Sequence, residues 1–272
     1  MLEGRITNRS VASGAWGDSL AALNRMRGPA ALAVLGLVLL TSLPLIWNHG
    51  SPVGFRPGQD SARILAWNGL MLTLFALGES LLLAPIAIAV HRFILLGEAP
   101  GTYRFDWAVP RFRRFVAYAC LLDLAWSLPV GLMAALQLVS TPLSVLAGLL
   151  GFLATAILSV RLALLFPAVA IDAPDAGWQG ALALSRDRGW TIFLALLLTE
   201  LVGMLIVAVA SPLKTWGFEL ALNDHLMSGA LLVGSVEAVT TLVTGAALVA
   251  AASRLYRNLH AAAEPDAEAV PG

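Results

Sequence analysis

Six long apolar stretches limit what this chain can fold into. They cover residues 29–47, 64–90, 115–139, 142–171, 190–211 and 228–255. Each has at least about the 18–20 residues that a helix needs to cross a hydrocarbon core of about 30 Å. None has the short alternating pattern of a barrel strand, so helices are the way to satisfy their backbones in lipid. The sequence therefore predicts an all-α fold, a polytopic membrane helical bundle with six transmembrane helices.

Composition supports this class and excludes others. The chain is 58% hydrophobic and 12% charged, and its formal net charge is zero, so no overall field attracts it to nucleic acid. It has one cysteine, Cys120, which rules out a disulfide framework or a cysteine-based zinc site within one chain. Among 17 basic residues only Lys214 is a lysine, a bias that indicates a GC-rich bacterial genome.

The arginines indicate how the helices are oriented. Thirteen basic residues flank the spans on the side of both termini, and three flank them on the other side. Because basic residues are retained in the cytoplasm, we expect a multi-pass protein of the bacterial inner (plasma) membrane with both termini cytoplasmic, N-in/C-in. The expected parts are a cytoplasmic N-terminal segment with an amphipathic helix (1–28), a six-helix transmembrane domain (29–259) and a disordered cytoplasmic tail (260–272).

A short basic pattern precedes each outward helix. Arg-x-Arg occurs before the first, third and fifth spans, and a tryptophan precedes each pair. Tryptophan and arginine settle at headgroup depth, so these residues are predicted interfacial anchors. They are Trp16, Arg25, Arg27, Trp107, Arg111, Arg113, Trp178, Arg186 and Arg188. The pattern fits either three independent anchors or three copies of one hairpin unit, and anchoring is the interpretation we favour.

Two segments before these pairs are predicted to be cytoplasmic interfacial amphipathic helices, at residues 12–24 and 174–185. In the first, Trp16, Leu20 and Leu23 share one face, which we expect to point toward the acyl boundary. On the opposite side, residues 212–224 are expected to lie on the outer interface through Trp216 and Leu220.

Five ionisable residues lie inside the spans and form a predicted intramembrane polar cluster. They are Glu79, Asp123, Arg161, Glu200 and Glu237. If each span is one straight helix, the first four lie about 14–18 Å above the cytoplasmic ends and Glu237 about 26 Å. Arg161 would then pair with Asp123 or Glu200. The cluster is either structural, holding helices together, or a site for protons, a cation or a polar headgroup; we favour the structural interpretation.

Packing signals also occur within the spans. Small residues recur every fourth position in the fourth span and predict a close helix contact; they are Ala147, Gly151, Thr155, Ser159 and Ala163. Pro85, Pro129 and Pro167 lie within spans and free backbone carbonyls there.

Catalytic and metal-binding motifs are missing from the sequence. It contains no G-x-S-x-G, G-x-x-x-x-G-K or H-E-x-x-H. The four histidines fall on alternating sides of the membrane in the expected topology, so we expect no metal site and no cofactor.

The stretch "RLALLFPAVAID" followed by "GWQGALALSRDRGWTIF" (161–193) resembles a known group. It is similar to uncharacterised bacterial six-span membrane proteins related to the membrane domain of glycerophosphodiester phosphodiesterases. There, Arg-x-x-x-x-x-Pro ends a span and an Ala-Leu-x-x-Ser helix precedes the next one. The family's catalytic domain is absent from this sequence, so the resemblance implies an all-helical membrane domain without that activity.

Two functions remain open from the sequence. One is a non-catalytic membrane module that organises lipids or partner proteins, with membrane lipids, a membrane-protein partner or a second copy as its contacts and no nucleic acid. The other is a small transporter or proton-coupled carrier that uses the intramembrane Arg/acid cluster. We favour the module.

The orientation is testable with reporter fusions. A reporter fused after Arg104 should behave as cytoplasmic and one near Gln59 as external, because translocating Arg111, Arg113 and Arg114 together is unfavourable. An external signal after Arg104 would overturn the six-span topology.

Overall fold

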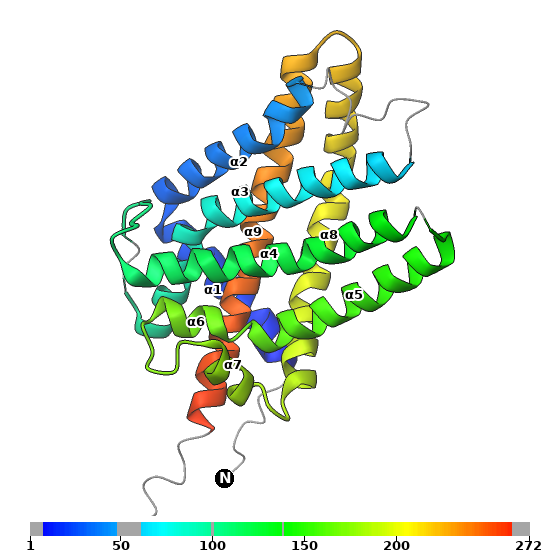
Figure 1. The fold of residues 1–272 in the computed structure, drawn as a ribbon. Helices are drawn as coiled ribbons and strands as arrows, with labels where there is room; N and C mark the ends of the chain where they lie inside the picture. Colours follow the sequence, from blue (N-terminus) through cyan, green and yellow to red (C-terminus); the bar gives the residue numbers. More distant parts are fainter. Residues whose placement is uncertain (1–7, 48–60, 99–100, 138, 263–272) are drawn as a thin grey trace, which may run out of the picture.

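A computed structural model describes residues 8–47, 61–98, 101–137 and 139–262, and these residues form helices and no strand. Figure 1 shows α2 to α5 lying one below another, crossed by α8 and α9. The helices are α1 (Asn8–Arg25), α2 (Arg27–Trp47), α3 (Ser61–Leu96), α4 (Pro110–Gln137), α5 (Thr141–Leu162), α6 (Leu165–Ala170), α7 (Trp178–Leu184), α8 (Gly189–Leu222) and α9 (Leu226–Ala261).

Six of these helices are long and apolar enough to cross a membrane, namely α2, α3, α4, α5, α8 and α9. One of them covers most of each predicted stretch, so the predicted all-α, polytopic bundle is confirmed. With 34 and 36 residues, α8 and α9 are roughly 51 and 54 Å long. Figure 1 shows their hairpin extending past the other helices at the top.

The fourth stretch is not one helix, which corrects the assumption behind the predicted charge depths. α5 ends at Leu162, and the short α6 begins only at Leu165. Pro167 has no N–H to bond the Ala163 carbonyl, and its ring crowds that carbonyl, so a continuous helix is unfavourable here. Arg161 therefore lies in the last turn of α5 rather than in the middle of a span.

Two prolines inside intact helices, Pro129 and Pro212, have their freed carbonyls bonded by hydroxyls. In α4, Pro129 leaves the Ala125 carbonyl without its usual partner. The Thr155 hydroxyl of α5 donates to it (3.3 Å) and shares this donor with the Gly151 carbonyl of its own helix (3.0 Å). In α8, Pro212 leaves the Ala208 carbonyl without its usual partner, and the Ser211 hydroxyl donates to it (2.8 Å). Such replacement is what allows proline within a membrane helix.

The predicted small-residue stripe of α5 packs against α4. A Cβ at Gly151 would lie 3.0 Å from the Pro129 ring. Further along, the Trp126 indole N–H donates to Ser159 (3.0 Å). Toward the start of α5 the contact moves to Gly148, which faces Met133, in place of the predicted Ala147.

The segment expected on the outer interface is instead part of α8. The helix continues through Pro212 to Leu222 and then turns into α9. Glycines let the two helices meet at the turn, since a Cβ at Gly229 would collide with the backbone of Gly217 and Ala221. Residues 212–222 therefore extend the α8–α9 hairpin.

The first helix packs into the bundle through small residues. Val11, Ala15, Ser19 and Ala22 are buried on one face of α1, against α9 and α8. Leu20, on the face predicted from the sequence to meet lipid, is 54% exposed. α1 thus buries its small residues in protein and leaves the larger Leu20 outside.

The role of Thr155 predicts a measurable loss of stability. Thr155→Val keeps the side-chain shape but leaves the Ala125 carbonyl unbonded, so unfolding in detergent should become easier by about 0.5–2 kcal/mol. Thr215→Val is the matched control, because the Thr215 hydroxyl bonds only its own helix at an exposed position. Equal effects of the two changes in a thermal unfolding assay would contradict this role.

Candidate functional site

Three of the predicted intramembrane acids come together in the structure. Glu79 of α3 lies close enough to Asp123 of α4 and Glu237 of α9 for their charges to repel it. Thr241 of α9 donates a hydrogen bond to Glu79, and Ser80 faces Asp123. The structure therefore brings these acids into one group between α3, α4 and α9.

The basic member of this group is Lys214, which the sequence analysis had placed on the outer flank. Its ammonium forms an ion pair with Glu237. A sequence signal for a continuous helix was present but weak: between Ser211 and Leu222 there is one proline, Pro212. That proline lies within α8 without ending it.

Arg161 and Glu200 do not join the acids. Arg161 is exposed at the end of α5 and, within the described part of the chain, makes no hydrogen bond or ion pair. Glu200 lies next to the contact between Gly203 of α8 and Thr244 of α9. The predicted pairing of Arg161 with Asp123 or Glu200 is therefore wrong, because α5 ends before Pro167.

Most of the predicted anchors gather at one end of the bundle, formed by the starts of α2, α4 and α8 and the ends of α3, α5 and α9. We call this the arginine-rich end. Direct contacts hold it together: Arg254 pairs with Asp18 (2.6 Å), Arg188 donates to the Leu259 carbonyl (3.5 Å), and Arg257 donates to the Ile94 carbonyl (3.4 Å).

The remaining anchors have nearby or exposed positions. Arg25 lies over the Phe93 ring, and Arg27 bonds Asn24. Trp107 and Trp178 are about half exposed and contact the rings of Phe112 and Tyr118. Arg113 and Arg186 are exposed. Trp16 differs, since its indole nitrogen is buried without a hydrogen-bond partner among the described residues.

Asp172 organises the middle of the arginine-rich end. It follows α6 with a φ of +54°, the left-handed position that glycine usually takes at a helix end. Its carboxylate receives a hydrogen bond from Arg111 (3.0 Å) and lies 4.0 Å from Arg92. Arg92 also donates to the Ala170 carbonyl (3.0 Å), one of the unpaired carbonyls at the end of α6. One short helix thus fixes arginines from α3 and α4.

Tyr103 ties the loop between α3 and α4 back to α3. Its hydroxyl donates to the Leu82 carbonyl (2.7 Å), in the turn before Pro85. Burial raises the pKa of the Tyr103 phenol above its ordinary value, so the hydroxyl keeps its proton further into the alkaline range. This bond holds the loop over a hollow at the arginine-rich end.

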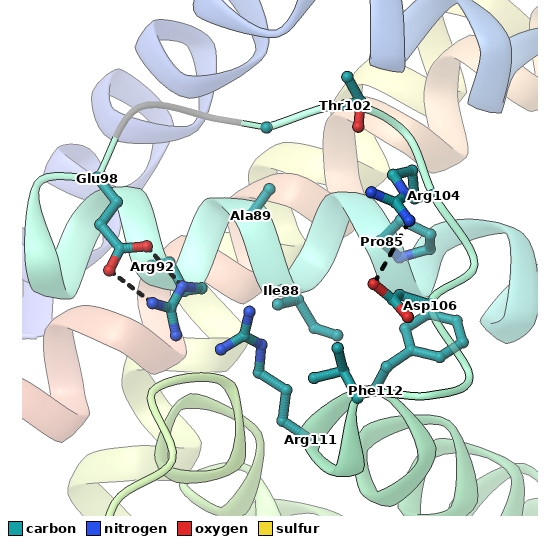
Figure 2. Close-up of a pocket in the computed structure, with 12 residues that line it drawn as sticks. Pro85, Ile88, Ala89, Arg92, Glu98, Thr102, Arg104, Asp106, Arg111 and Phe112 are labelled. Carbon is teal, nitrogen blue, oxygen red and sulfur yellow. Dashed lines mark hydrogen bonds and ion pairs between the residues drawn. The ribbon is translucent and has the colours of Figure 1, made fainter.

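That hollow, which we call the rim pocket, is an open cavity of about 310 Å³. Its floor is apolar and includes Pro85, Ile88 and Phe112. Its rim is charged and consists of Arg92, Glu98, Arg104, Asp106 and Arg111. Figure 2 shows the Arg92 and Arg111 guanidinium groups on one side and the Arg104–Asp106 pair on the other.

The rim arginines differ in how strongly they are engaged. Arg92 binds both carboxylate oxygens of Glu98 (2.5 and 2.6 Å). Arg104 is 71% exposed and its contact with Asp106 is long, at 3.8 Å. Arg111 uses one nitrogen to bond Asp172. Guanidinium groups bind phosphate oxygens in pairs, and carboxylates attract ammonium groups. The rim therefore presents groups for both charges of a zwitterion above an apolar floor.

One buried histidine lies outside this pocket. The Ser253 hydroxyl donates to the Val249 carbonyl (2.9 Å) and accepts a hydrogen bond from Nδ1 of His91 (2.7 Å). Both side chains are at most 1% exposed. The pair joins α3 to α9 inside the bundle, where a substrate has no access.

Comparison with family models, curated proteins and solved structures finds no match for this chain. Among the described residues, no group of three or more histidine, cysteine, aspartate or glutamate side chains could hold a metal ion.

The Lys214–Glu237 pair predicts non-additive stability. Lys214→Met leaves Glu237 without its cation, so adding Glu237→Gln should recover about 1 kcal/mol of unfolding free energy. The measurement is a double-mutant cycle of thermal stability in detergent. The control cycle pairs Arg161→Gln with Glu237→Gln and should be additive. Additivity in both cycles would show that the ion pair contributes nothing.

Proposed function

We propose that this chain is a non-catalytic module of a bacterial inner membrane that organises lipids at the cytoplasmic surface. The rim pocket carries the proposal, because it combines an apolar floor on α3 and α4 with arginines and acids at its edge. A phospholipid has groups that match these in the same order. Its acyl chains are apolar, its phosphate is negative and, in a zwitterionic lipid, its ammonium group is positive.

The proposed orientation has both termini in the cytoplasm. The excess of arginine at the arginine-rich end supports it, since basic flanks are retained on that side. The rim pocket then lies at the depth of the inner-leaflet headgroups. The half-exposed Trp107 beside it is suited to the same depth.

Within this proposal the spanning helices also expose apolar surfaces that can contact other proteins in the membrane. A membrane-protein partner or a second copy of the chain would meet the same exposed apolar surfaces. The resemblance of residues 161–193 to the membrane domain of glycerophosphodiester phosphodiesterases fits a module of this kind.

A second proposal is a small transporter or proton-coupled carrier. The observation that favours it is the group of Glu79, Asp123 and Glu237, for which Lys214 supplies one positive charge. Carboxylates that repel one another at membrane depth need a proton or a cation to relieve them. Arg161, which the sequence analysis included in this mechanism, is not available for it.

The lipid proposal is tested by native mass spectrometry of the purified chain with added phosphatidylethanolamine. Arg104→Gln and Arg111→Gln should each weaken lipid retention about tenfold, since a hydrogen bond to a charged group is worth about 1.5–3 kcal/mol. Arg113→Gln, on the same helix and outside the pocket, is the control and should retain the lipid.

Equal retention by all four proteins would count against the rim pocket. Proton uptake into proteoliposomes that depends on Glu79 and Asp123 would support the carrier instead.

A further inference from the structure

A second apolar hollow lies between α5 and α8, away from the rim pocket. It is an open groove of about 430 Å³, within the range of roughly 300–1,000 Å³ of ligand sites. Leu153, Ile157 and Val160 of α5 form one wall, and Trp190 and Phe193 of α8 form the other. α5 crosses α8 here, as Figure 1 shows.

The groove has a defined base and an open face. Val160 packs against a buried cluster that includes Ile192 and Ala195 of α8. The outer parts of the walls are exposed, including Ile157 at 54% and Trp190 at 71%. Because α5 and α8 are membrane-spanning by length and composition, this open face meets the acyl chains of the bilayer.

One positive charge lies at the end of this groove. Arg161 lines it in the last turn of α5. Unlike Arg92, Arg111 and Arg254, Arg161 has no acid partner in the described ranges. Gly189, at the start of α8, lines the same end, where the helix dipole adds partial positive charge. An unpaired guanidinium at the end of an apolar groove is complementary to an amphiphile with a negatively charged headgroup.

We propose that the groove binds one anionic phospholipid, with its phosphate on Arg161 and an acyl chain between α5 and α8. Charge complementarity selects this occupant: a zwitterionic headgroup would place its ammonium near a site that lacks a carboxylate. The inference shares with the proposed function the premise that lipids are ligands. It concerns a different site, which prefers an anionic lipid, whereas the rim pocket prefers a zwitterionic one.

The test uses the purified full chain and phosphatidylglycerol, with phosphatidylethanolamine as the competing lipid, in native mass spectrometry. Wild type should retain phosphatidylglycerol while phosphatidylethanolamine is present, and Arg161→Gln should weaken that retention about tenfold. Arg186→Gln, exposed at the same end and outside the groove, should retain it. Arg161→Gln should leave the retention of phosphatidylethanolamine unchanged, which separates this site from the rim pocket.

A second variant tests the acyl chain without altering charge. Ile157→Trp fills the groove and should lower phosphatidylglycerol retention to a similar extent, while a circular dichroism spectrum confirms that the helices remain. In a variant that keeps Trp190 as its one tryptophan, brominated phosphatidylglycerol should quench the fluorescence saturably, and adding Arg161→Gln should abolish this quenching.

Three results would overturn the proposal. The first is loss of phosphatidylglycerol from wild type when an equal amount of phosphatidylethanolamine is added, and the second is unchanged retention of phosphatidylglycerol in Arg161→Gln. The third is a wild-type dimer that Ile157→Trp converts to monomer, which would show that a second copy of the chain fills the groove.

Discussion

A backbone carbonyl inside a membrane must have a donor, and much of this bundle follows from how its prolines meet that demand. At Pro129 and Pro212 a hydroxyl supplies the missing hydrogen bond and the helix continues. At Pro167 the helix ends instead, which creates α6 and the turn at Asp172. The arginine-rich end depends on that turn, because Asp172 holds arginines from two spanning helices. The same interruption places Arg161 beside the start of α8.

Close approach of helices is the second determinant, and it relies on small residues because apolar side chains gain nothing from leaving lipid for protein. Ser42 of α2 donates to the Ala230 carbonyl of α9 (2.9 Å), at a point where a Cβ on Gly234 would collide with the serine. Gly14 of α1 faces Arg254 of α9 in the same way. The helices α1, α2, α3 and α8 all contact α9, so four helices pack on this one.

The sequence predicted the six spans and the gathering of arginines at one end, because both follow from local composition. It did not predict where the intramembrane charges meet. Depth counting treated residues 142–171 as one helix, although Pro167 shortens it, and this error misplaced Arg161. Lys214 was assigned to a flank, although a single proline does not end α8. The rim pocket was also missed, since it needs the Tyr103–Leu82 and Arg111–Asp172 contacts, which join distant parts of the chain.

The contact of α1 with α9 also bears on how the molecule is made. Asp18 and Arg254 are 236 residues apart, and at about 5–20 residues per second a ribosome needs on the order of 10–50 s to cover that distance. During this time the buried face of α1 has no α9 to pack on, and neither does Ser42 of α2. Insertion of α9 is therefore the step that closes the bundle. In a chain cut short before α9, the earlier helices would be inserted in the bilayer but would lack the helix on which α1, α2, α3 and α8 pack.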